Sequence, residues 1–114
     1  MEPTLVRYSL EDHVATITLD RPAVRNALNR AAYAELEAAF RQAQRDSAVR
    51  CVLLTGTDPA FCSGDDVKEI MLGAERDAAL ERLRDVRPAP TPAAVAVLEC
   101  DRPVIAAVNG PAVG

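Results

Sequence analysis

The sequence predicts an α/β fold in which helices pack against a sheet that contains parallel strands. Residues 51–55 form a short apolar run, which is typical of a strand buried on both faces of a parallel sheet. Residues 30–46 have the apolar spacing of a helix, and strand-like segments precede them at residues 4–10 and 14–19. The predicted order of strand, strand, helix, strand and a further helix is that of a layered α/β domain.

The two segments before the helix are predicted to be strands joined by a polar turn. Within residues 14–19, Ala15, Ile17 and Leu19 alternate with the intervening residues, which fits a half-buried strand. His13, the only histidine, is expected in the turn, where it faces water and has no functional partner.

The helix at residues 30–46 is expected to begin after Asn29, whose side chain is a suitable N-cap. Its apolar residues recur at the spacing of one buried face: Ala32, Leu36, Ala39, Phe40 and Ala43. We therefore expect this helix to be a packing element whose charged residues face solvent.

A turn and the start of a second helix are predicted after residue 56. Pro59 and Gly64 mark the turn, and Asp65 and Asp66 suit the positive end of a helix dipole. Free backbone N–H groups at such an end can hold an anion or a developing negative charge. The segment therefore predicts a site for chemistry on a carbonyl group.

The last third of the chain is predicted to contain a helix at 78–86, a proline-rich loop at 87–93, a helix at 93–99 and a buried strand at 103–108. A parallel strand that leaves through a glycine-rich turn is expected to lead into another helix. Residues 1–114 are therefore expected to be the N-terminal portion of a domain whose C-terminal remainder is absent.

Composition argues against several classes of protein. The 114 residues fit one domain, and a net charge of −4 with a pI near 4.9 argues against nucleic acid as a partner. Cys51, Cys62 and Cys100 lack metal-ligand spacing, so we expect no metal site and reduced thiols, with Cys51 and Cys100 buried. No signal peptide or membrane-length apolar run is visible, which predicts a cytoplasmic protein without a membrane partner.

Three segments of the chain, at residues 19–28, 60–69 and 101–114, closely resemble motifs of the enoyl-CoA hydratase/isomerase (crotonase) superfamily. The resemblance implies a crotonase-like spiral of ββα units, of which this chain would hold the N-terminal portion. It also implies acyl-CoA thioesters as substrates, with coenzyme A as part of the substrate and no separate cofactor. A homotrimer or hexamer is implied for the complete protein. The chemistry shared by the family is stabilisation of a thioester enolate by two backbone N–H groups.

The resemblance assigns a site to particular residues. The first enolate donor matches the backbone N–H of Asp65, whose carboxylate is expected to face water and help cap the helix. Positions near the bound CoA match Ala23, Val24, Arg25, Ser63, Gly64, Asp66, Val67 and Lys68. Gly114 matches the first glycine of the turn that supplies the second donor. In a purely structural interpretation, Ser63 and Asp66 serve the helix start, and Arg25 and Lys68 are solvated.

Two functions remain open from the sequence. The first is an enoyl-CoA hydratase, or alternatively an isomerase, whose acid and base residues lie beyond this chain; Glu69 and Glu99 do not match them. The second is a catalytically inactive fragment that acts only in CoA binding or subunit assembly, with a complementary C-terminal chain as a partner. Covalent catalysis by Cys62 or Ser63 is disfavoured, because the sequence around them is not a nucleophile motif and His13 is the only histidine.

Overall fold

The structure of the chain is a computed structural model that describes residues 4–68 and 91–113. The helix predicted at 78–86 and most of the loop predicted at 87–93 lie outside the described residues, as do Glu69 and Gly114. No helix within the two described ranges is long and apolar enough to cross a membrane.

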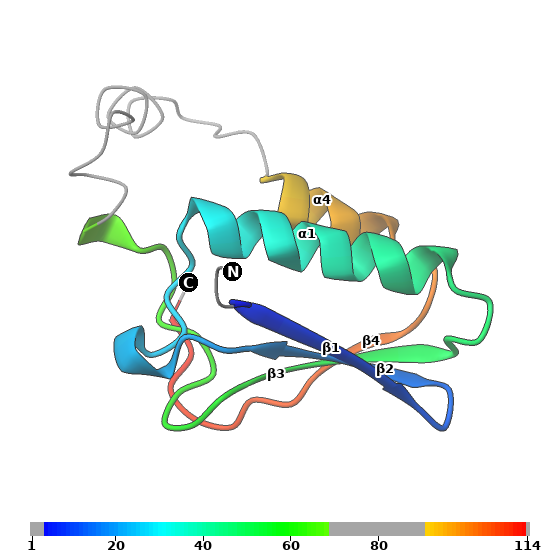
Figure 1. Cartoon of the computed structure of the whole chain (residues 1–114), viewed down its shortest axis with the longest axis horizontal. Coiled ribbons are helices and arrows are strands. Elements are labelled where there is room, and N and C mark those ends of the chain that lie inside the picture. The colour runs from blue at the N-terminus through cyan, green and yellow to red at the C-terminus, as the bar shows by residue number, and fades with distance from the viewer. Residues whose placement is uncertain (1–3, 69–90, 114) are drawn as a thin grey trace.

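The described residues form a mixed α/β layer, as predicted. A four-stranded sheet has the order β1 (Val6–Glu11), β2 (Val14–Leu19), β3 (Cys51–Gly56) and β4 (Val104–Ala106) (Figure 1). β1 and β2 form an antiparallel hairpin, whereas β2, β3 and β4 run parallel to one another. The predicted strand at 14–19 has the predicted bounds, and the turn before it contains the exposed His13.

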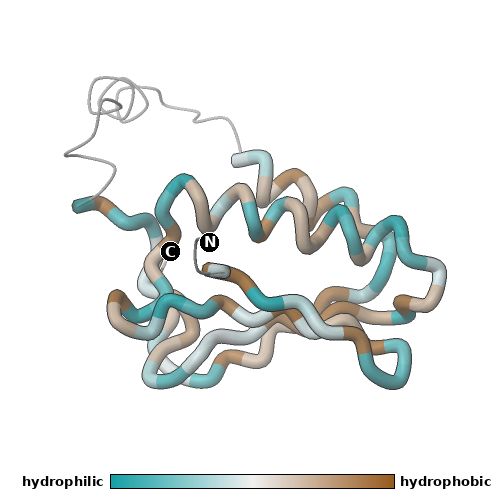
Figure 2. Tube along the Cα trace, viewed as in Figure 1, coloured by the Kyte–Doolittle hydropathy of each residue, from teal (hydrophilic) through white to brown (hydrophobic). Residues whose placement is uncertain are grey.

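Helix α1 (Arg30–Arg45) covers one face of the sheet, and the shorter helix α4 (Pro92–Glu99) packs beside it (Figure 1). Asn29 is the N-cap of α1, since its side chain accepts a hydrogen bond from the Ala32 N–H at 2.8 Å. All five apolar residues predicted for the inner face are buried, and hydrophobic and hydrophilic residues alternate along α1 (Figure 2). Apolar periodicity was therefore sufficient to predict this helix and its buried face.

The opposite end of α1 is held by Arg102, just before β4. Its guanidinium donates hydrogen bonds to the main-chain oxygens of Gln44, Asp46 and Val49, at 2.8, 3.1 and 3.2 Å. These include carbonyls at the C-terminal end of the helix, where a cation is favourable. Arg102 thus joins the end of α1 to the beginning of β3 and β4.

The prediction that residues 51–55 and 103–108 are buried strands is wrong in part. In β3 only Val52 is buried, and β4 is confined to three residues, with Ile105 54% exposed. The helices cover the face that contains Val52, and no described element covers the other face. An apolar run predicts a strand, but burial also requires a second covering layer.

The expected burial of the cysteines is also wrong for two of the three. Cys51 and Cys100 are half-buried, whereas Cys62 is the buried one; all three are free thiols. Cys51 precedes Val52 in β3 and therefore points to the uncovered face, since successive residues of a strand alternate. Cys100 is the C-cap of α4, at the end of the helix rather than on its packed face.

Candidate active site

The candidate site lies where β2 and β3 end, at the carboxyl edge of the parallel strands. Residues 20–29, which include the short 3-10 helix η1 (Pro22–Val24), and residues 57–68 lie side by side there (Figure 1). The Leu28 N–H donates to the Gly64 oxygen at 2.8 Å, and the Asp66 N–H donates to the Leu28 oxygen at 2.9 Å. Two of the three segments that carry the resemblance are therefore hydrogen-bonded to each other.

The third segment joins the same place. The Phe61 N–H donates to the Pro111 oxygen at 3.1 Å, and the Val113 N–H donates to the Cys62 oxygen at 2.9 Å. Residues 111–113 therefore run alongside residues 61–62, a few residues before Asp65. Segments far apart in the sequence meet at one end of the sheet.

A buried asparagine organises this end of the molecule, and the sequence did not identify it. Asn26 is fully buried; its amide NH₂ donates to the oxygens of Thr57 and Ala60, both at 2.8 Å. Its side-chain oxygen accepts from the Arg21 N–H at 2.8 Å. One side chain thus joins the two loops. The φ of 58° at Asn26 is a conformation that asparagine adopts more readily than most residues, but no signal in the sequence alone marks this position as the connection.

Gly56 permits this close approach. A Cβ atom at position 56 would lie 2.4 Å from the Phe61 oxygen and 2.9 Å from the Asn26 amide nitrogen. Any side chain there would push residues 60–61 away from the end of β3, so glycine is required where the strand leaves the sheet.

Arg21 and Asp66 form a second polar connection. The guanidinium lies 3.2 Å from the Asp66 carboxylate and donates to the Ala27 oxygen at 2.5 Å, with the two side chains only 15% and 13% exposed. The helix that the sequence predicts near Asp65 and Asp66 begins at Val67. Asp66 is therefore engaged in an ion pair directly before the helix, and Asp65 precedes the helix in an extended bridge with Leu28.

The Asp65 N–H differs from its neighbours. The Gly64 N–H approaches the Cys62 sulfur at 3.4 Å, the Asp66 N–H donates to Leu28, and the Val67 N–H donates to the Asp65 oxygen at 2.9 Å. Within residues 4–68 and 91–113, no group accepts a hydrogen bond from the Asp65 N–H. Asp65 lies at an exposed position.

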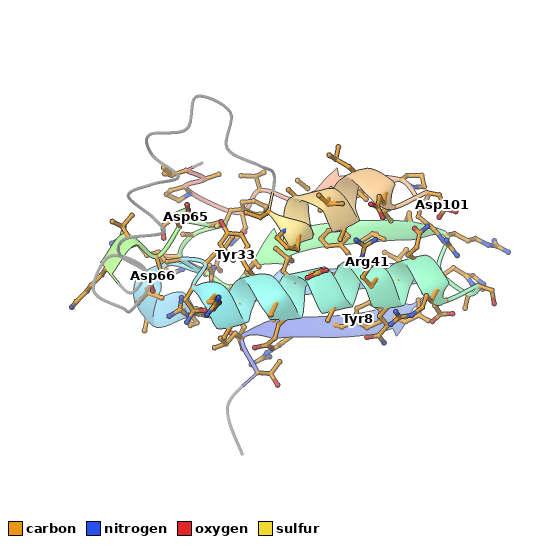
Figure 3. All side chains as sticks on the ribbon, turned by 90° about the horizontal axis from the view of Figure 1, so that it is seen from above. Tyr8, Tyr33, Arg41, Asp65, Asp66 and Asp101 are labelled. Atoms are coloured by element: carbon orange, nitrogen blue, oxygen red, sulfur yellow. The ribbon has the colours of Figure 1, made fainter. Side chains whose placement is uncertain are left out.

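The Asp65 carboxylate has a partner that the sequence did not suggest. The Tyr33 hydroxyl, on the first part of α1, donates a hydrogen bond to it (Figure 3). Asp65 is exposed, as expected, but its carboxylate accepts this hydrogen bond from α1, and no described N–H at the start of the following helix donates to it. Burial raises the pKa of Tyr33, and the hydrogen bond and charge of Asp65 raise it further, so the phenol remains a donor at neutral pH.

The other residues assigned to the CoA groove fall into two groups. Ala23, Val24 and Arg25 are exposed in and directly after η1, and Val67 and Lys68 are exposed at the start of the helix that follows Asp66. Ser63 and Gly64 connect the loops instead: the Ser63 hydroxyl donates to the Val24 oxygen at 3.2 Å, and Gly64 is buried with a φ of 91°. The described residues contain no group of three or more metal-ligating side chains.

Comparison with known proteins identifies the family. The Enoyl-CoA hydratase/isomerase family model matches residues 9–114, so the chain belongs to the crotonase superfamily. A probable enoyl-CoA hydratase of Rhodobacter capsulatus is 43% identical over 109 residues, which are 96% of this chain but 40% of the relative. The mitochondrial Delta(3,5)-Delta(2,4)-dienoyl-CoA isomerase of Mus musculus is 36% identical, over 93% of this chain and 34% of the relative.

The fold agrees with this assignment. The crystal structure of an enoyl-CoA hydratase/isomerase from Mycobacterium paratuberculosis superposes with a TM-score of 0.77 at 32% identity. The match covers 98% of this chain and 44% of that one. The chain therefore has the crotonase fold and spans less than half the length of these relatives.

Proposed function

We propose that this chain forms the acyl-CoA-binding part of an enoyl-CoA hydratase, and that the backbone N–H of Asp65 stabilises the thioester enolate. The observation that supports this most is that no group in residues 4–68 and 91–113 accepts a hydrogen bond from the Asp65 N–H, at an exposed position between engaged neighbours. A fixed backbone donor aimed at an oxygen that gains negative charge lowers the barrier to forming that charge. The donor serves without moving, because the bonds at Gly64 and Asp66 hold the peptide on both sides.

The second donor is proposed to follow Gly114. The Val113 N–H donates a hydrogen bond to the Cys62 oxygen, so the end of the described chain lies beside the segment that leads to Asp65. Two N–H groups that approach one thioester oxygen from two segments would form the oxyanion hole that the family resemblance implies.

The coenzyme A moiety is proposed to lie along the two exposed segments 23–25 and 67–68. Arg25 in the first segment and Lys68 in the second supply positive charge for its phosphates, while Val24 and Val67, 43% and 63% exposed, offer apolar surface. No cofactor other than the CoA of the substrate is proposed. A homotrimer or hexamer and a cytoplasmic location remain part of the proposal.

An isomerase is the second candidate within the same class. The mouse relative is named a dienoyl-CoA isomerase, and an Escherichia coli relative that is 35% identical is named 1,2-epoxyphenylacetyl-CoA isomerase. Hydration and double-bond migration would use the same enolate site and would differ in which groups move protons. Assay of crotonyl-CoA hydration against double-bond migration in 3-enoyl-CoA decides between them.

The enolate donor is tested by removing the N–H at position 65 in the intact polypeptide that carries this chain. Asp65→Pro deletes the N–H, and Asp65→Ala keeps it while removing the same carboxylate. We expect kcat for Asp65→Pro to fall ~10²–10³ below that of Asp65→Ala. Affinity for butyryl-CoA, which binds as a neutral thioester rather than as an enolate, should be similar in the two variants. Equal kcat values in the two folded variants would refute the role of this N–H.

The alternative of a non-catalytic fragment is tested with residues 1–114 alone. We expect CoA-thioester binding without turnover of crotonyl-CoA, and activity restored by mixing with the C-terminal segment of a relative. Turnover by the 114 residues alone would contradict our placement of the second donor and of the acid and base residues.

A further inference from the structure

We propose that Tyr33 is a positioning residue for the enolate site: it holds the Asp65 carboxylate against α1 and so keeps the Asp65 N–H free for the thioester oxygen. This inference rests on the proposed function of that N–H. It assigns a role to a side chain that lies 32 residues away in the sequence and outside the three segments that carry the resemblance.

The Asp65 carboxylate can compete with the substrate for the Asp65 N–H. Aspartate side chains readily accept hydrogen bonds from nearby backbone N–H groups. A carboxylate that turned toward residues 65–67 would occupy the donor that the substrate needs. It would also place a negative charge beside a developing enolate, which is unfavourable.

Tyr33 restrains this carboxylate. Its hydroxyl donates to one oxygen of Asp65, and in the described part of the chain no cation pairs with Asp65. The nearby guanidinium of Arg21 is committed to Asp66 and to the Ala27 oxygen. Tyr33 is therefore the contact that sets the direction of the Asp65 side chain.

Tyr33 is itself held in place by α1 and the hydrophobic core. It follows the Asn29 N-cap, and its N–H donates to the Asn29 oxygen at 3.0 Å. The ring is half-buried and packs against the hydrophobic core below α1. Since the raised pKa of Tyr33 keeps the phenol protonated at neutral pH, the restraint persists throughout the range in which such an enzyme works.

The experiment is a double-mutant cycle in the intact polypeptide that carries this chain, with Tyr33→Phe introduced into the wild type and into Asp65→Ala. In the wild type, we expect kcat for crotonyl-CoA to fall about tenfold, the effect of one competing hydrogen bond or charge at an oxyanion site. Affinity for acetoacetyl-CoA, whose enolate can be followed by absorbance, should fall by a similar factor. Affinity for butyryl-CoA should stay within about twofold.

In the Asp65→Ala background, the same substitution should change none of these values, because no carboxylate remains to be restrained. Tyr8→Phe is the matched control: it removes a hydroxyl below the other end of α1 and should leave kcat unchanged. Thermal unfolding of each variant checks the fold, and kcat is compared below the unfolding midpoint of the least stable variant.

An equal loss from Tyr33→Phe in both backgrounds would show a structural role and overturn the inference. No loss in either background would overturn it as well. Failure of the wild-type protein to bind any CoA thioester would instead remove the proposed function, and this outcome is seen before any variant is made.

Discussion

The layer between α1 and the sheet and the loops at the carboxyl edge of the sheet are held together in different ways. In the layer, Ile17, Phe40 and Val52 are fully buried and apolar. At the loops, Asn26 is a fully buried polar side chain, and the nearby Arg21–Asp66 pair is largely shielded from solvent. One region is organised by apolar area and the other by directed hydrogen bonds.

This difference separates stability from site geometry. Apolar burial stabilises roughly in proportion to area and tolerates small shifts of the packed groups. A buried amide adds little net stability, but its partners become unsatisfied when it is removed, and its geometry is specific. We therefore expect changes in the layer to act on unfolding and changes at the loops to act on ligand binding.

The largest expected loss of stability comes from Phe40→Ala. Phe40 is 0% exposed at the centre of the buried face of α1, so truncation removes apolar contacts and leaves a cavity. We expect the free energy of unfolding to fall by about 3–5 kcal/mol, measured by urea titration and circular dichroism. CoA-thioester affinity of the folded fraction should change little. Ala34→Ser, at an exposed position of α1, is the control and should change the free energy of unfolding little. A loss below about 1 kcal/mol for Phe40→Ala would contradict the view that this layer is the main source of stability.

Asn26→Ala tests the same contrast at the loops. The change removes the amide that donates to the Thr57, Ala60 and Phe61 oxygens and the acceptor of the Arg21 main-chain N–H. Of these partners, the Ala60 oxygen keeps the Asn109 side chain as a donor, at 3.3 Å. We expect a loss of about 2 kcal/mol of unfolding free energy, smaller than for Phe40→Ala, because the remaining partners lose a hydrogen bond that water replaces only in part.

Affinity for a CoA thioester should fall more for Asn26→Ala than for Phe40→Ala, since the two loops are no longer held together. Asn26→Asp is the matched variant: it keeps the acceptor for Arg21 but directs a carboxylate at carbonyl oxygens, so it should bind the ligand as poorly as Asn26→Ala. Affinity unaffected by either substitution would show that the groove does not depend on this asparagine.

The same division explains what could be predicted from the sequence. Periodic apolar spacing located α1, its N-cap and its buried face, because these depend on residues close together in the chain. The Asn26–Ala60 and Tyr33–Asp65 contacts join residues 34 and 32 positions apart, and each depends on a single polar side chain. No periodicity marks such contacts, so the resemblance could predict site residues, whereas the connections between them emerged only from the structure.

The smallest expected effect concerns Tyr8, the counterpart of Tyr33 near the other end of α1 (Figure 3). Its buried hydroxyl has no hydrogen-bond partner among the described residues, whereas the Tyr33 hydroxyl has Asp65. Tyr8→Phe removes an unsatisfied polar group, so at pH 7 we expect the free energy of unfolding to stay the same or to rise by up to about 1 kcal/mol. A clear loss of stability at pH 7 would mean that the hydroxyl has a favourable partner.

Alkaline pH sharpens this test. Burial, followed by the charge of Asp46, raises the pKa of Tyr8 above its ordinary value of 10.0. The folded chain then keeps a proton that the unfolded chain loses, so this group leaves stability unchanged well below pH 10 and lowers it as pH rises beyond that value. Tyr8→Phe should lose less stability than the wild type between neutral and alkaline pH, measured by urea titration at each pH. Tyr33 has a raised pKa too, so part of the alkaline loss should persist in Tyr8→Phe and diminish further in the double variant with Tyr33→Phe.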